Sequence, residues 1–151
     1  MTLVVGAANI AGGFFGMMTL KKISKKDNLK FGVLGQLVGF ILLYVGVKIS
    51  SSLLCSLAVI IFMMGFAMGM GSVVTLYTAD VVPAIGVGIA TAAQWFGSTI
   101  IGKVVPLLIG PIGETGLLLI FVVCCALILE YIHEFCIHTE GLTDDEIRAK
   151  I

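Results

Sequence analysis

Five long apolar stretches follow one another along this chain, and they decide which folds are open to it. They cover roughly residues 3–20, 31–47, 53–79, 85–109 and 117–137. Most are near the ~20 residues that an α-helix needs to cross the hydrocarbon core of a bilayer. Inside lipid every backbone N–H and C=O group must be paired, and a helix pairs them within one segment. The sequence therefore predicts an all-α fold, a polytopic transmembrane bundle of about five spans over residues 1–138.

Composition supports this prediction and argues against other classes of protein. Hydrophobic residues make up 59% of the chain and charged residues 12%, whereas soluble domains carry roughly 25% charged residues. The formal net charge is zero, so the basic face that nucleic acid requires is missing and we expect no nucleic-acid partner.

Motifs for enzyme chemistry are also missing from the sequence. It contains no GxSxG, HExxH, P-loop or GxGxxG pattern, so we predict no enzymatic activity and no cofactor. Glu130 and His133 match the Glu-x-x-His pair of di-iron bundles, but the further ligands of such sites have no counterpart. We therefore predict no metal site.

The connections between the apolar stretches indicate an orientation. Lysines gather between the first two stretches, and Arg148 and Lys150 lie in the polar tail, residues 139–151. The positive-inside rule places this loop and the C-terminal tail in the cytosol. The N-terminus then lies outside, which is typical of a piece of a larger protein. In the tail, residues 143–146 have the form of a capping box.

Glycine patterns add detail within the stretches. Three of them carry GxxxG, a spacing that lets helices approach closely: Gly12 to Gly16, Gly35 to Gly39 and Gly65 to Gly69. The third stretch is long enough to tilt or to be interrupted near residues 69–71.

Polar groups inside the spans are the candidates for function, because lipid makes them costly. The densest group is Gln94, Trp95 and Ser98 in the fourth stretch. A sugar ring can stack on an indole while an amide and a hydroxyl bind its OH groups, so this group suits a sugar. The alternative is that Trp95 packs inside the bundle.

Several segments together resemble one known family. Residues 77–83 read YTADVVP and residues 86–95 read GVGIATAAQW; they are similar to Y-T-A-E-x-x-P and G-x-x-x-A-x-x-x-N-W of the sugar porters. The tail at 138–147, HTEGLTDDEI, resembles P-E-T-K-G-x-T-x-E-E-I, and KKISKK at 21–26 stands where the family has D-R-x-G-R-R. The chain thus resembles spans eight to twelve of the twelve-span major facilitator fold.

The resemblance implies a sugar site. Asn9 corresponds to the sugar-binding asparagine of span eight, and Trp95 to the tryptophan that lies under the sugar. Gln94 replaces the asparagine before that tryptophan. Ser98 stands where glucose transporters have another asparagine, and Thr75 replaces their span-ten tryptophan.

The resemblance also implies a cytosolic latch. Lys25 and Lys26 correspond to two arginines of the family and Asp80 to its glutamate, a pairing that closes the cytosolic side of the C-terminal half in the outward-facing state. Lysine is a point charge rather than a bidentate fork, so this latch is weaker in geometry. Ala67 departs from the pattern, because glucose transporters have a glutamate there, and the first seven spans have no counterpart.

Two functions follow from these expectations. The first is transport of a small solute, a sugar such as a hexose, by alternating access. For this the chain requires the N-terminal half of the transporter as its partner. The resemblance implies an integral protein of the plasma membrane. The second is a non-transporting membrane sensor or scaffold derived from the same fold.

Overall fold

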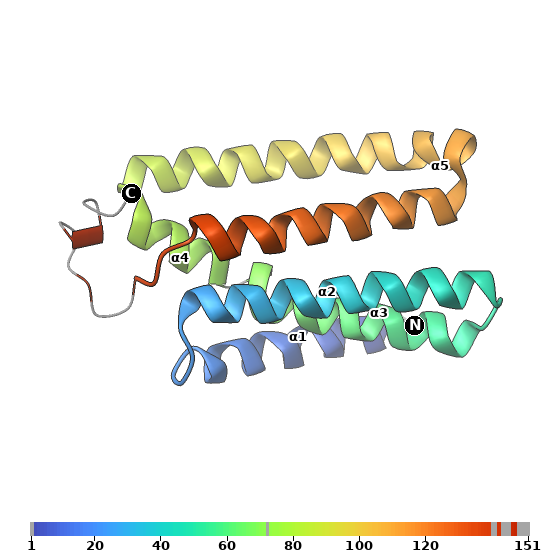
Figure 1. The fold of residues 1–151 in the computed structure, drawn as a ribbon, viewed down its shortest axis with the longest axis horizontal. Helices are drawn as coiled ribbons and strands as arrows, with labels where there is room; N and C mark the ends of the chain where they lie inside the picture. Colours follow the sequence, from blue (N-terminus) through green and yellow to red (C-terminus); the bar gives the residue numbers. More distant parts are fainter. Residues whose placement is uncertain (1, 72, 140–141, 143–145, 148–151) are drawn as a thin grey trace.

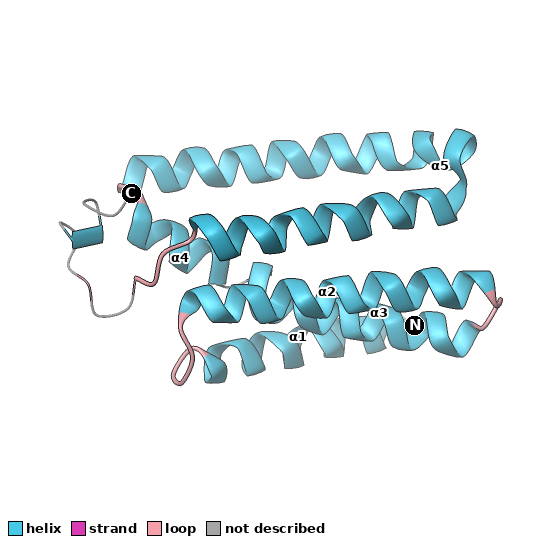
Figure 2. Ribbon diagram, in the orientation of Figure 1, coloured by secondary structure: helices cyan, strands magenta, loops and turns pink. Residues whose placement is uncertain are grey.

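A computed structural model describes residues 2–71, 73–139, 142, 146 and 147 of the chain. Within these residues every regular element is helical (Figure 2). The elements are α1 (Thr2–Thr19), α2 (Lys25–Lys48), α3 (Ser52–Phe66), the π-helical turn η1 (Ala67–Gly71), α4 (Val73–Val81) and α5 (Ala84–Phe135). The all-α prediction is confirmed. The predicted capping box falls mostly on tail residues outside the described ones.

Serine caps set the starts of two helices. The Ser24 hydroxyl accepts a hydrogen bond from the backbone N–H of Asp27 at 3.1 Å, at the start of α2. Ser51 accepts one from the N–H of Leu54 at 3.4 Å, at the start of α3. Each cap pairs an N–H group that the first helical turn would leave unpaired. The chain can therefore reverse within a few residues, at 20–24 between α1 and α2 and at 49–51 between α2 and α3.

The third apolar stretch is divided by a single π-helical turn. Helix α3 ends at Phe66, η1 covers Ala67–Gly71, and α4 continues to Val81. The interruption lies where the glycines predict it. A π-turn carries an extra residue in the helix and is frequent at functional sites.

The fourth and fifth stretches form one helical run of 52 residues that reverses at Gly113. Gly113 has φ 70° and ψ 165°, a backbone conformation that glycine adopts at little cost. Figure 1 shows the chain doubling back here, so α5 has a first half (residues 84–112) and a second half (residues 114–135). By length and apolar composition, three segments of the described chain are candidates to cross a membrane: Lys25–Lys48, Ser52–Val81 and Ala84–Phe135.

The GxxxG glycines lie at the helix crossings. A methyl group built on Gly65 of α3 would lie 2.8 Å from both the backbone nitrogen of Gln36 and the carbonyl oxygen of Gly32 in α2. One built on Gly16 of α1 would lie 3.0 Å from the carbonyl oxygen of Met68 in η1. The predicted close approach of these helices is confirmed.

The core joins α2, α4 and the second half of α5. Its buried side chains are Leu29, Val33, Val73, Cys125 and Ile132. Outside this core large apolar side chains are exposed, including Phe96 at 70% and Leu107 at 75%. A protein in water rarely leaves so many large apolar side chains uncovered, and with its long apolar helices this chain is an integral membrane protein.

Candidate functional site

A small cavity lies between α4 and the first half of α5. Its volume is ≈ 220 Å³. The residues that line it come from the end of α3, from η1, α4 and α5: Phe66, Met70, Val74, Thr75, Thr78, Val87, Ala90, Thr91 and Gln94. The structure therefore brings Thr75 and Gln94, two of the predicted binding residues, to one cavity.

The polar groups of this cavity differ in what they can offer a ligand. The hydroxyls of Thr78 and Thr91 donate to carbonyl oxygens of their own helices, at 2.7 Å to Val74 and 2.8 Å to Val87. Their lone pairs are still able to accept. The Gln94 side chain has no hydrogen-bond partner among the described residues. Its amide can both donate and accept, which is what a sugar hydroxyl requires.

Trp95 and Ser98 lie beside this cavity but do not line it. They follow Thr91 by four and seven residues on α5, a spacing that places all three on one side of the helix. Both are exposed, and Trp95 is exposed to 70%. Trp95 therefore does not pack inside the bundle that this chain forms.

Asn9 is the predicted binding residue that lies apart from the others. It is exposed on α1, whereas the cavity is lined by residues from α3, η1, α4 and α5. The described part of the chain does not bring Asn9 to Thr75 or Gln94.

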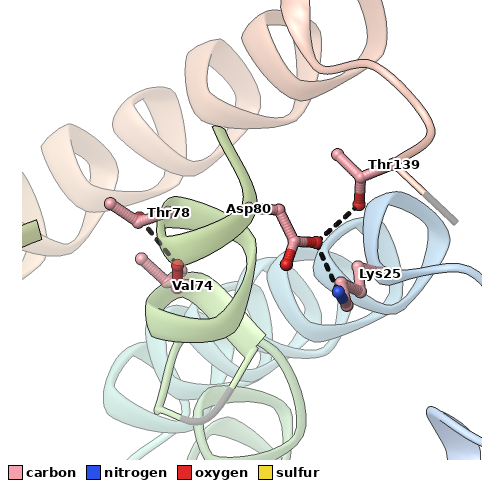
Figure 3. A network of polar contacts seen from close by, with 5 residues as sticks. All are labelled: Lys25, Val74, Thr78, Asp80 and Thr139. Carbon is pink, nitrogen blue, oxygen red and sulfur yellow. Dashed lines mark hydrogen bonds and ion pairs between the residues drawn. The ribbon is translucent and has the colours of Figure 1, made fainter. Parts of the chain in front are cut away.

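A charged cluster joins the ends of three elements (Figure 3). Lys25 at the start of α2 forms an ion pair with Oδ2 of Asp80 near the end of α4. The Thr139 hydroxyl, beyond the end of α5, donates to the same oxygen at 2.8 Å. The side chains of Lys25 and Asp80 are each 27% exposed. One carboxylate oxygen thus holds α2, α4 and the chain after α5 together.

Lys26, the other predicted latch residue, makes a different contact. Its Nζ donates to the backbone carbonyl oxygen of His133 in α5 at 2.9 Å. The structure therefore places Lys25, but not Lys26, on Asp80.

Sequence reasoning missed the contacts of the segment after α5. The backbone N–H of Ile137 donates to the Tyr77 hydroxyl at 2.9 Å, and His138 Nδ1 lies 3.1 Å from the Ser24 hydroxyl oxygen. Together with Thr139, these contacts fix residues 137–139 against α4 and the start of α2. A threonine just past an apolar stretch gives no signal of a partner 59 residues earlier.

The family is decided by comparison with known proteins. The model of the family described as "Sugar (and other) transporter" matches residues 1–150. The chain belongs to this sugar transporter family. The resemblance to the sugar porters is thereby confirmed.

Relatives and solved structures agree with the family. Membrane transporter D1 of Leishmania donovani is 27% identical over 145 residues, which cover 87% of this chain and 26% of that protein. The inward open xylose transporter XylE from E. coli has a TM-score of 0.88 at 23% identity. A double tryptophan mutant of XylE has a TM-score of 0.87 at 22% identity. Each structure matches 98% of this chain and 34% of its own.

Three statements follow from these matches. The fold is that of part of a major facilitator transporter, as predicted. The chain spans about a quarter of the length of the curated relative and about a third of the solved chains. The family and its structural neighbours are transporters rather than enzymes.

Proposed function

We propose that this chain is the C-terminal part, spans eight to twelve, of a sugar porter that moves a hexose across the membrane by alternating access. The observation that carries the proposal is the meeting of Thr75 and Gln94 in one cavity between α4 and α5. Membership of the sugar transporter family supports a sugar as the substrate.

The sugar would bind through complementary contacts. The Gln94 amide exchanges hydrogen bonds with ring hydroxyls, Thr75 adds a hydroxyl, and Trp95 and Ser98 extend the site along the same helix. The cavity of ≈ 220 Å³ is smaller than the ~300–1,000 Å³ of typical ligand pockets. We propose that the N-terminal half of the transporter completes it, because transporter sites form between repeats near the bilayer midplane. Asn9 would join the sugar only in that completed site.

The ion pair of Lys25 and Asp80 would serve as the cytosolic latch. A partly exposed pair contributes up to about 1 kcal/mol, an amount that a gate can gain and lose in each transport cycle. Lys26 would support the latch from the neighbouring position, where it ties α2 to α5 through the His133 carbonyl. We place this end of the bundle, with the C-terminal tail, in the cytosol of a plasma-membrane protein, because the lysines gather here.

One observation favours the second candidate function, a non-transporting sensor or scaffold. Ala67 stands where glucose transporters have a glutamate, and it is only 4% exposed. A methyl group built on Gly12 of α1 would lie 2.8 Å from its Cβ. A longer side chain at position 67 would push α1 away, so in this chain the position packs helices instead of binding a ligand.

Uptake of labelled hexose by cells that lack their own hexose transporters distinguishes the two functions. Gln94→Ala in the native protein should lower uptake about tenfold, since two lost hydrogen bonds to the sugar are worth roughly 0.5–1.5 kcal/mol each. Trp95→Ala should also lower it. Thr99→Ala is the matched control, because Thr99 is exposed on the same helix and, among the described residues, its hydroxyl bonds only the Trp95 carbonyl, at 2.9 Å. Unchanged uptake in both site variants would favour the sensor or scaffold.

A further inference from the structure

A second hollow lies away from the proposed sugar site, between α2 and the second half of α5. It has a volume of ≈ 390 Å³ and is lined by Lys30, Leu34, Leu129, Glu130 and His133. None of these residues lines the cavity that holds Thr75 and Gln94. We call this hollow the α2–α5 groove.

The rim of the α2–α5 groove offers several hydrogen-bond donors. Lys30 Nζ lies 3.2 Å from His133 Nδ1. A lysine ammonium only donates, so Nδ1 accepts and the ring proton is on Nε2, where it can donate outward. Lys26 Nζ donates to the His133 carbonyl oxygen at 2.9 Å. Two ammonium groups and an imidazole N–H thus gather at one point, near the first turns of α2.

The walls of the groove become apolar farther along both helices. Leu34 follows Lys30 by four residues, and Leu129 precedes His133 by four residues. At 1.5 Å per residue, each leucine lies about 6 Å deeper along its helix than the basic rim. The groove therefore has basic side chains at its rim and two leucines farther along its walls.

We propose that the α2–α5 groove binds an anionic phospholipid. Its phosphate would bind Lys30 and His133, with Lys26 nearby, and one acyl chain would lie along Leu34 and Leu129. Basic pockets between transmembrane helices at the membrane surface bind such headgroups. The Glu130 carboxylate lines the same groove and repels the phosphate, which moderates the affinity. A soluble phosphate ester would use only the rim, and the apolar walls favour the lipid.

Native mass spectrometry of the protein in detergent tests this site, with phosphatidylglycerol as the probe and phosphatidylcholine as the neutral comparison. We expect phosphatidylglycerol to be retained preferentially. Lys30→Gln should weaken its binding about fivefold, the contribution of one lysine near an anionic surface. Lys30→Arg should keep the preference, and Glu130→Gln should strengthen it. The control is Lys103→Gln, a change at an exposed lysine on the first half of α5. It should leave phosphatidylglycerol binding unchanged.

Four results would overturn the proposal. They are equal retention of the two lipids, unchanged binding in Lys30→Gln, an equal loss in Lys30→Arg and Lys30→Gln, and complete displacement of the lipid by soluble glycerol phosphate. The thermal midpoint of each variant in detergent shows whether it is folded. If Lys30→Gln fails to fold, Glu130→Gln decides, because only a site for a negative charge gains affinity when that carboxylate is removed. The lipid proposal does not rest on the proposed transport, although Lys26 also supports the proposed latch.

Discussion

At the scale of single residues, the proposed latch between Lys25 and Asp80 depends on one oxygen atom. Asp80 Oδ2 accepts from both Lys25 and Thr139. The resemblance to the sugar porters could predict the pairing of Lys25 with Asp80, because both stand at positions of a known motif. It could not predict which of the two lysines, Lys25 or Lys26, pairs with Asp80. Adjacent residues on a helix point about 100° apart, and only the packing decides which one faces α4.

Reversing the charges of Lys25 and Asp80 tests the latch. Asp80→Lys should lower uptake by placing two like charges together at the end of α4, while folding and surface expression change little. Adding Lys25→Asp should restore uptake, because the ion pair is remade with its charges exchanged. The triple variant, Asp80→Lys with Lys25→Asp and Lys26→Asp, should also take up hexose.

The matched control for this exchange is Asp80→Lys with Lys26→Asp alone. It should not restore uptake, because Lys26 bonds the His133 carbonyl and not Asp80. If Asp80→Lys with Lys25→Asp stays inactive at normal surface expression, the gating role of the pair is wrong.

At the scale of helices, the glycines determine how closely α1, α2 and α3 pack. The GxxxG spacing predicts close approach, but it does not name the partners. In the structure Gly65 of α3 meets Gly32 and Gly35 of α2, so the crossing uses a glycine outside the α2 motif. The reversal in α5 lies between the predicted stretches 85–109 and 117–137, so the sequence predicts its region. Only the structure shows that the residue with the positive φ is Gly113.

A pair of alanine substitutions tests the helix crossing. Gly65→Ala should destabilise the protein by about 1–3 kcal/mol, the usual cost of overpacking, because its new methyl group meets backbone atoms of Gln36, Gly32 and Gly35 within 2.9 Å. Gly13→Ala is the control, since nothing lies within 4 Å of a methyl group there. The thermal midpoint in detergent should fall for the first variant and not for the second. Equal midpoints would show that the helices can separate at little cost.

At the scale of the whole molecule, hydropathy was enough to predict the helices, because lipid imposes one solution on an apolar backbone. The site was predictable only in part. Thr75 and Gln94 line one cavity, whereas Asn9, Trp95 and Ser98 do not line it. The sequence marks Asn9, Trp95 and Ser98 as polar groups within apolar stretches, but helical spacing alone does not fix which neighbouring helix each of them faces.

We propose above that this chain forms the sugar-binding part of a hexose transporter. The most direct test is uptake of labelled hexose by proteoliposomes that contain the native protein. We expect uptake that saturates with concentration and that falls when unlabelled hexose is added in excess. Uptake no greater than that of empty liposomes, by protein shown to be folded and inserted, would contradict the claim.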